Sequence, residues 1–328
     1  TVNPDFGQVE ADPSEVNLST YETFFPEKRP FFIEGKSILS YSLQFGDGDL
    51  GAENLFYSRR IGRAPQYYPE VMDGEYIDMP DFTSILGAAK ITGKSPDGWS
   101  VGILESVTAE ENAEIKGIGS GKTQVIEPLT NYMVGRLQKD FNKGNTYIGG
   151  MITGVNRSIS DSNLEFLHKS AYTGGIDLVH KWDDKNWMMD AGIFGSQVNG
   201  TTEAILRTQT SMIRNFQRPD ANYIEVDSTL TTLSGLGGKF SLSKVGGKFN
   251  FGTIISAKSP GLELNDIGYA QQVDNILEVL WSNYHFNDPF SIFRQMHIHA
   301  NQFAVWDFGG NRNVLGGNIG GNAQFTNY

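Results

Sequence analysis

From residue 84 onward the sequence alternates apolar and polar side chains in long strands that are joined into hairpins. Residues 170–182 read SAYTGGIDLVHKW, in which one face is apolar and ends in Trp182 while the other is polar or small. The pattern repeats from Trp187 to Ile193, and only Asp-Asp-Lys-Asn separates the two stretches. Strands of about ten residues with this period, aromatic ends and tight turns are typical of transmembrane β-barrels.

The same reading predicts about eleven antiparallel strands between residues 84 and 328, joined alternately by short turns and longer loops. Short periplasmic turns and long outer loops are the usual asymmetry of outer-membrane barrels. A soluble β-sandwich would alternate too, but its strands average about five or six residues. The predicted fold is therefore all-β, an antiparallel transmembrane β-barrel. Because such barrels have even strand numbers and no open edge, we expect missing strands or another chain to close the sheet.

Composition narrows the class of protein further. The 328 residues include no cysteine and carry a net charge of −12. Without cysteine there are no disulfides, no thiolate catalysis and no cysteine-ligated metals. The acidic balance argues against nucleic acid as a partner. No apolar run reaches the roughly 18 residues of a transmembrane helix. Because the chain starts at Thr1, we expect a processed product or part of a longer protein.

Residues 1–83 differ from the strand series. This stretch is rich in proline, acidic and aromatic residues and has no sustained period. Prolines would interrupt a long β-ladder. Phe24, Phe25, Phe31 and Phe32 are denser than an ordinary linker would carry. The segment is therefore predicted to be a plug or strap, placed in the barrel lumen or at its periplasmic mouth.

Three arginines, Arg59, Arg60 and Arg63, follow this acidic stretch. Fixed cations beside carboxylates predict internal ion pairs, and binding of a substrate anion is the alternative. The candidate acidic partners are Asp5, Glu10, Asp12 and Glu15.

Two motifs resemble ligand sites but are incomplete. Asp47, Asp49 and Glu53 could bind calcium, but they lack the full ligand series of a calcium loop, which favours a solvated turn. KGIGSGKT at 116–123 resembles a phosphate-binding loop, but Lys116 stands where glycine is required and no helix follows. A flexible outer loop is predicted there, with no nucleotide and no cofactor.

Polar side chains alternate with apolar ones near the C-terminus. Met296, Ile298 and Ala300 form an apolar face that should meet lipid. The opposite face should line the lumen, with no third metal ligand evident. Its residues are Gln295, His297, His299 and Asn301.

Aromatic residues crowd the predicted short-turn end of the strands. Such rings prefer the level of the lipid headgroups, so they are predicted to form the periplasmic girdle. The girdle residues are Trp99, Trp182, Trp187, Phe286, Phe290 and Trp306. In the long loop at 199–227, the spacing of apolar residues from Glu203 to Phe216 predicts a short helix on the outer surface or over the pore.

Three blocks together resemble a known family: NPDFGQVEADPSEVNLSTYETFFPEKRPFFIEG, FYSRRIGR and SPGLELNDIGY at 259–269. They resemble the uncharacterised outer-membrane β-barrel family of Bacteroidota-type bacteria, whose members usually begin with a domain similar to family-nine carbohydrate-binding modules. The resemblance implies a protein of the Gram-negative outer membrane whose barrel follows the first block. That carbohydrate-binding domain and the closing strands are absent here, so we expect this chain to be a portion of a longer protein.

The sequence shows no hydrolase triad, zinc-protease helix or nucleophile elbow. The first functional hypothesis is a non-enzymatic channel, translocation or export component with a plugged lumen. The second is a structural or accessory subunit of a larger outer-membrane complex. The third is a surface glycan-binding or hydrolase-associated protein that works through its loops. The expected partners are the outer-membrane lipid bilayer and other envelope proteins.

Overall fold

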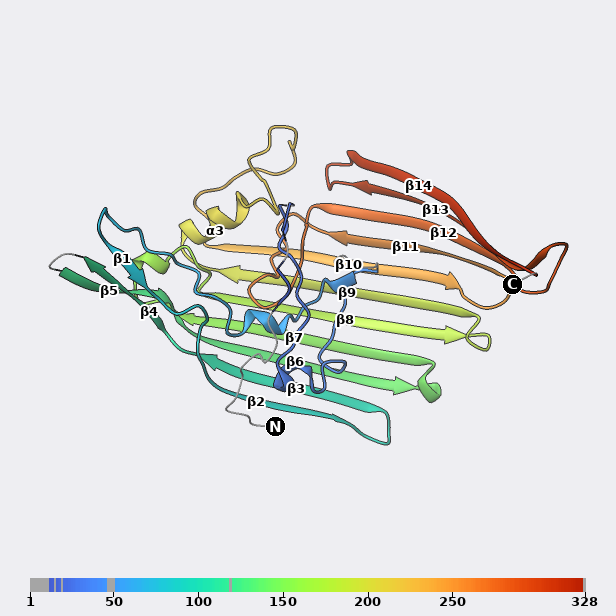
Figure 1. The fold of residues 1–328 in the computed structure, drawn as a ribbon, viewed down its shortest axis with the longest axis horizontal. Coiled ribbons are helices and arrows are strands. Elements are labelled where there is room, and N and C mark those ends of the chain that lie inside the picture. The colour runs from blue at the N-terminus through green and yellow to red at the C-terminus, as the bar shows by residue number, and fades with distance from the viewer. Residues whose placement is uncertain (1–11, 15, 19, 46–50, 118–119, 327–328) are drawn as a thin grey trace.

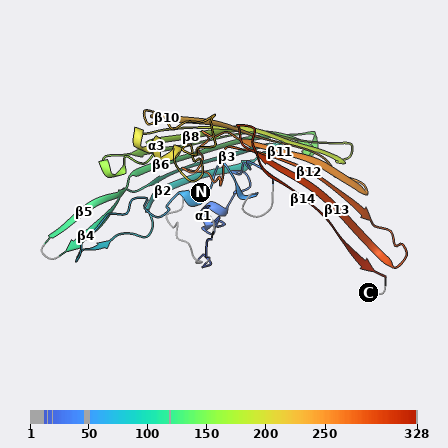
Figure 2. The same cartoon turned by 90° about the horizontal axis from the view of Figure 1, so that it is seen from above.

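The computed structural model describes residues 12–14, 16–18, 20–45, 51–117 and 120–326. Within them the main element is an antiparallel sheet of eleven strands that bends into an arch (Figures 1 and 2). The strands are β2 (Ile85–Lys94), β3 (Trp99–Thr108), β6 (Leu129–Phe141), β7 (Thr146–Ser158), β8 (Ser170–Trp182), β9 (Trp187–Asn199), β10 (Thr232–Lys244), β11 (Phe249–Lys258), β12 (Asn275–Phe286), β13 (Phe293–Trp306) and β14 (Arg312–Phe325).

Strands that follow one another in the sequence lie side by side in this sheet, except where β3 pairs with β6. Between them, β4 (Glu111–Gly117) and β5 (Ser120–Glu127) form a separate hairpin, to which β1 (Tyr76–Asp78) adds a third strand. Of the KGIGSGKT motif, residues 116–117 lie in β4 and residues 120–123 lie in β5, so the prediction of a loop is wrong for these residues. Their extended backbone differs from the strand and helix that flank a phosphate-binding loop.

The all-β, antiparallel fold predicted from the sequence is confirmed. The sheet is an open arch, however, because β2 and β14 are its edges and do not pair with each other. Few helices interrupt the strands: α1 (Pro30–Ile33), α3 (Thr202–Gln209) and the 3₁₀ turns η1 (Ser58–Arg60), η2 (Asn142–Gly144) and η3 (Ser162–Leu164). Of these, α3 is the short helix expected within 203–216. In the described part of the chain, no helix has the length and apolar character needed to cross a membrane.

The pairing register makes each face of the sheet continuous. Ile176 of β8 lies opposite Ile193 of β9 on the convex face, where they are 58% and 67% exposed. One residue away, Gly175 lies opposite Phe194 on the concave face, where Phe194 is buried. The same alternation exposes apolar side chains across the convex face: Ile91, Ile103, Leu137, Ile148, Ile152, Leu236, Ile255, Leu280, Ile298, Leu315 and Ile319.

The N-terminal segment lies in the concavity of the arch (Figure 2). The Tyr41 hydroxyl lies 2.9 Å from the carbonyl oxygens of both Ile176 and Ile193. This approach requires glycine in the wall, since a Cβ atom on Gly175 would lie 2.8 Å from the Tyr41 ring. One apolar core therefore joins segment and sheet. It includes Phe31, Leu39, Leu43, Leu55 and Ile61 from the segment, and Leu104, Val134, Met151 and Phe194 from the strands.

The strand ends differ in their connections. At one end, called the turn end here, lie the short connections 95–98, 142–145, 183–186, 245–248 and 287–292. The opposite or loop end carries β4 and β5, α3 and the connections 159–169, 200–231, 259–274 and 307–311.

The connection at 307–311 is short, yet it lies at the loop end. Trp306 pairs with Ile276, which is near the start of β12. The placement of Trp306 in a girdle at the short-turn end is therefore wrong. Loop length had suggested the end, but strict antiparallel alternation decides it.

Candidate functional site

A buried ion pair fastens the N-terminal segment to the wall of the arch. The Lys258 Nζ atom of β11 lies 2.6 Å from Glu53 Oε2, and both side chains are buried. The other carboxylate oxygen, Oε1, accepts a hydrogen bond from the Gln271 backbone N at 2.8 Å. Glu53 is thus no part of a solvated turn, while Asp47 and Asp49 lie outside the described residues. A sequence does not show this pairing, because 205 residues separate its members.

Charged side chains on the concave face of the wall are also paired. Arg136 donates two hydrogen bonds to the Asp177 carboxylate, at 2.6 and 2.7 Å. The guanidinium of Arg136 also lies 5.3 Å from the centre of the Tyr41 ring in the N-terminal segment. Arg136 is therefore neutralised within the wall, while Lys258 is neutralised by the segment.

The three arginines of the segment have different partners. Arg59 binds Asp12 through two hydrogen bonds of 2.8 and 2.7 Å. Arg60 binds Glu22, an acidic residue that the sequence analysis did not single out, through two hydrogen bonds of 2.7 Å. Arg63 has no ion pair with any carboxylate of the described residues, and its Nε atom is buried without a hydrogen-bond partner. Asp5, Glu10 and Glu15 lie outside the described residues.

Asp266 is the centre of a buried polar network at the loop end. Its carboxylate accepts hydrogen bonds from Arg157 at 2.6 Å and from His168 Nδ1 at 2.8 Å. The second ring nitrogen of His168 lies 2.7 Å from the Thr208 hydroxyl, which itself donates to the Ala204 carbonyl at 3.0 Å. Both ring nitrogens of His168 therefore act as donors, as in an imidazolium. The network joins β7, the connection 159–169, α3 and the connection 259–274.

The charges of this network follow from its contacts. Burial alone would lower the pKa of His168, but the Asp266 carboxylate outweighs it and raises that pKa above the usual value. Burial alone would raise the pKa of Asp266, but His168 and Arg157 hold that pKa well below its usual range. Both shifts favour the charged forms of His168 and Asp266, in agreement with the two hydrogen bonds that the imidazole ring donates.

Next to this network lies a pocket of about 420 Å³ with an unusual density of arginine. Its charged and titratable lining consists of Arg60, Arg63, Arg207, Arg214 and His168 together with Glu22, Glu263 and Asp266. Arg214 pairs with Glu263 at 2.8 Å. The exposed Arg207 lies with its guanidinium 4.3 Å from the centre of the Phe166 ring. Arg60 and Arg63 stand out in the sequence, but the other members come from α3 and from segments far apart in the chain.

The residues predicted to line the lumen lie on the concave face of β13. His297 lies opposite His285 of β12, and their rings stack with centroids 4.6 Å apart. The ring centroids of His297 and His299 lie 5.4 Å apart. Asn301 donates a hydrogen bond to Asn318 at 3.1 Å. Gln295 lines the same recess of about 370 Å³ as His297. The described residues contain no group of three or more side chains that could hold a metal ion.

Aromatic rings form a continuous chain at the turn end. Trp182 and Trp187 stack with centroids 6.0 Å apart, and Trp187 meets Phe251 at 5.7 Å. Further contacts of 4.6 to 6.3 Å link Phe249, Tyr284, Phe286, Phe290, Phe293 and Phe325. Of the predicted girdle residues, Trp99 lies at the same end outside this chain, covered by the Lys139 ammonium at 4.9 Å.

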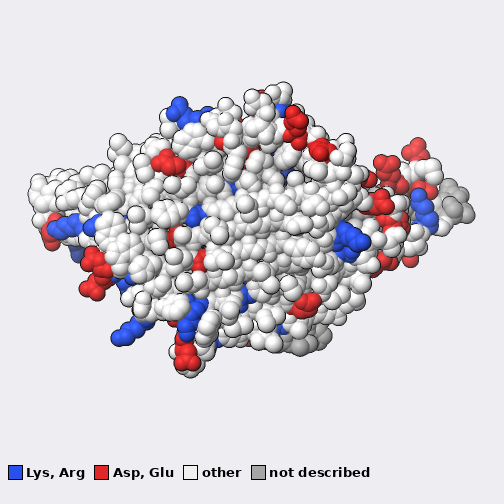
Figure 3. Space-filling model, turned by 180° about the vertical axis from the view of Figure 1, so that it is seen from behind, with Lys and Arg blue, Asp and Glu red and all other residues white. Residues whose placement is uncertain are grey.

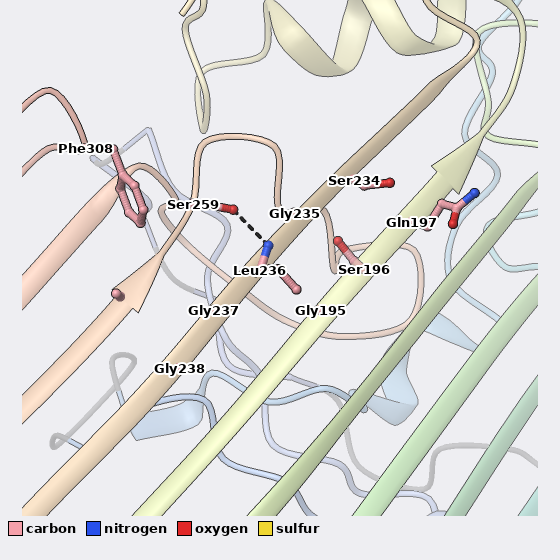
Figure 4. A pocket seen from close by; sticks show the side chains of 11 residues that line it. Gly195, Ser196, Gln197, Ser234, Gly235, Leu236, Gly237, Gly238, Ser259 and Phe308 are labelled. Carbon is pink, nitrogen blue, oxygen red and sulfur yellow. Dashed lines mark hydrogen bonds between the residues drawn. The ribbon is translucent and has the colours of Figure 1, made fainter. Parts of the chain in front are cut away.

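A hollow of about 890 Å³ lies between β9, β10 and the turn that carries Phe308 (Figure 4). Its lining is largely glycine and serine: Gly195, Ser196, Ser234, Gly235, Gly237, Gly238 and Ser259. The Leu236 backbone N donates a hydrogen bond to Ser259 Oγ at 2.8 Å, which ties β10 to the connection that follows β11. This hollow offers no charged group and therefore no candidate chemistry.

Breaking the pair of Glu53 and Lys258 tests how firmly the segment is held. Glu53→Gln or Lys258→Met alone should cost about 3–5 kcal/mol of unfolding free energy, because each leaves an uncompensated buried charge. The double variant should recover much of that loss. Denaturant titration measures the unfolding free energy of each variant. Lys248→Met is the control, because the pair of Lys248 and Asp288 is exposed and should contribute no more than about 1 kcal/mol to stability. Equal effects of both lysine changes would contradict the assignment.

The contribution of His168 to the folding stability of the protein should depend on pH. Because its folded pKa is raised above the ordinary value of 6.5, its stabilisation is complete below that value and is lost as the pH rises through the folded pKa. The stability difference between wild type and His168→Gln should therefore shrink as the pH rises above the ordinary histidine pKa of about 6.5. Thermal unfolding at matched ionic strength measures this difference. A pH-independent difference would show that Asp266 does not raise the pKa of His168.

Comparison with known proteins identifies one match. Residues 1–327 match the model of a family described as a domain of unknown function, DUF5916. A search of curated proteins finds no match. The chain therefore belongs to the DUF5916 family.

Proposed function

We propose that the eleven-stranded sheet is part of the wall of a transmembrane β-barrel in the outer membrane of a Gram-negative bacterium. The observation that carries the proposal is the continuous apolar convex face. Isolated apolar side chains are normal on a water-exposed surface, but contiguous patches of this extent mark contact with lipid or with another protein. The strands contain 10 to 14 residues, and a transmembrane strand needs about 9–11.

The distribution of charge along the strands supports the same orientation. Charged side chains on the convex face gather mainly at its margins (Figure 3). Of the charged residues on the strands of this face, Glu105 and Glu278 each lie three residues from the loop end, and Lys139 lies two residues from the turn end. At about 3.3 Å per residue, both carboxylates lie within roughly 10 Å of the loop end. There they would reach the headgroup layer rather than the hydrocarbon.

The aromatic chain at the turn end would lie at the opposite membrane surface. Tryptophan and tyrosine prefer the headgroup level because their rings are apolar while their N–H and O–H groups remain hydrated. The turn end would face the periplasm and the loop end the outside. In lipid, the free backbone groups of β2 and β14 would each cost several kcal/mol. The proposal therefore includes further strands that pair with both edges.

The proposed role is that of a non-enzymatic channel, translocation or export component whose lumen is closed by the N-terminal segment. The segment covers the concave face, and polar groups such as His297 and Asn301 would line the passage. An accessory subunit with a permanently filled lumen is the second candidate. The buried pair of Glu53 and Lys258 favours it, because a segment held by buried ion pairs resists displacement.

The membrane orientation can be tested with single cysteines, since the natural chain has none. Nitroxide labels at successive positions from 188 to 198 should alternate in their accessibility to oxygen. Ile193→Cys should show strong relaxation by oxygen, which concentrates in lipid, and Asp184→Cys in the turn should respond to a water-soluble nickel complex. Relaxation by the nickel complex throughout the convex face would refute the membrane assignment.

Conductance separates the two candidate roles. In planar bilayers, the full-length wild-type protein should be closed, while Glu53→Gln should show intermittent openings because the segment is held less firmly. Lys248→Met, which removes only the exposed pair, should stay closed like the wild type. If Glu53→Gln is folded and inserted but never conducts, the lumen is permanently filled and the accessory role replaces the transport role.

A further inference from the structure

The arginine-rich pocket at the loop end contains more cationic groups than its carboxylates can neutralise. Each carboxylate of the lining is already occupied. Glu22 binds Arg60, Glu263 binds Arg214, and Asp266 binds Arg157 and His168. Two guanidinium groups of the lining, those of Arg63 and Arg207, therefore remain without an ion pair among the described residues. The pocket has a net positive charge.

Arg63 is half-buried, and its Nε atom is fully buried. Its surroundings include the cations Arg60 and Arg157, which repel it, and the carboxylate of Glu127, which attracts it. Glu127 instead accepts hydrogen bonds from the backbone N and the side-chain Nε2 of Gln66, at 2.8 and 2.9 Å. Among the described residues Arg63 thus has no ion pair, and a buried guanidinium nitrogen without a partner is costly, which favours a bound anion.

Buried N–H groups without a partner cluster around the same pocket. The Nε atoms of Arg63 and Arg214 are buried and make no hydrogen bond to any residue that the structure describes. In Arg157, which binds Asp266, both Nε and Nη2 are likewise buried and have no hydrogen-bond partner among the described residues. Planar guanidinium groups with free donors match the oxygen geometry of phosphate and carboxylate groups. The exposed Arg207 supplies a further cation at the surface of the pocket.

The remaining lining sets the size and character of the ligand. Phe166, Leu167 and Ile213 are apolar, while Thr208, Ser211 and Asn265 offer hydroxyl and amide groups. A volume of about 420 Å³ lies within the range of small-molecule sites and exceeds that of one bare inorganic ion. We infer that this pocket binds the oxyanion group, phosphate or carboxylate, of a small molecule, with Arg63 as the central binding residue.

The first test uses inorganic phosphate as the probe. At constant ionic strength, replacing chloride with phosphate should raise the unfolding temperature of the full-length protein in a concentration-dependent way. Arg63→Gln should weaken phosphate binding by about tenfold to a hundredfold, as expected for the loss of charge-assisted hydrogen bonds. The unliganded variant should be no less stable than wild type, since an unpaired buried charge has been removed.

Two variants keep the test decisive. Arg59→Gln is the matched control, because Arg59 pairs with Asp12 and does not line the pocket, so phosphate binding should be unchanged. Arg207→Gln alters an exposed side chain that should not affect folding, and it should weaken phosphate binding by about threefold. The inference is overturned if phosphate and chloride give the same unfolding temperature, or if Arg63→Gln and Arg207→Gln both bind phosphate as wild type does.

Competition experiments distinguish the sources of the oxyanion. Glucose 6-phosphate and a short-chain phosphatidate are each titrated against the effect of inorganic phosphate. Tighter binding of the sugar phosphate would assign the pocket to a soluble molecule that arrives from the loop side. Tighter binding of the phosphatidate would assign it to a lipid headgroup. For either outcome, Arg63→Gln should abolish the competition of that compound with inorganic phosphate. None of these measurements depends on conductance or membrane orientation, so the inference can fail or succeed separately from the proposed function.

Discussion

The antiparallel hydrogen-bonded ladder from β2 to β14 is the constraint on which the other features of this structure depend. Because side chains alternate along each strand, a slip of one residue would exchange the two faces. Neighbouring strands pair in matching register across the sheet, so Ile176 and Ile193 share one face while Gly175 and Phe194 share the other. The ladder thereby separates an exposed apolar surface from a surface that packs against the N-terminal segment.

The concave side shows how an irregular segment can be fixed to a regular wall. Glycine at position 175 leaves room for the Tyr41 ring, and Tyr41 in turn reaches the backbone oxygens of two strands. Glu53 and Lys258 add a charge pair that is stable only while both members stay together. Side-chain packing and electrostatic attraction thus both hold the N-terminal segment against the sheet. Displacing the segment from the concave face would require both to be released.

At the loop end, the charged side chains are paired less completely than on the concave wall. On the wall, Arg136 and Asp177 neutralise each other, but in the pocket Arg63 and Arg207 have no carboxylate partner in the described part of the chain. Asp266 raises the pKa of His168, which favours its positively charged form. A fold that needed only stability would gain by pairing or removing these cations. Their accumulation beside apolar side chains is what a site for an anionic ligand requires.

Local pattern alone determined the fold class, the approximate number of strands and the face to which each side chain belongs, because the period of a strand is a property of adjacent residues. It also located Arg59, Arg60 and Arg63 and the short helix α3. Tertiary structure decided which charges meet, since Glu53 and Lys258 or Arg157 and Asp266 are far apart in the chain. It also decided the end at which Trp306 lies, which loop length had misjudged. Contacts between distant residues depend on the closure of long loops around the arch, and no local period encodes them.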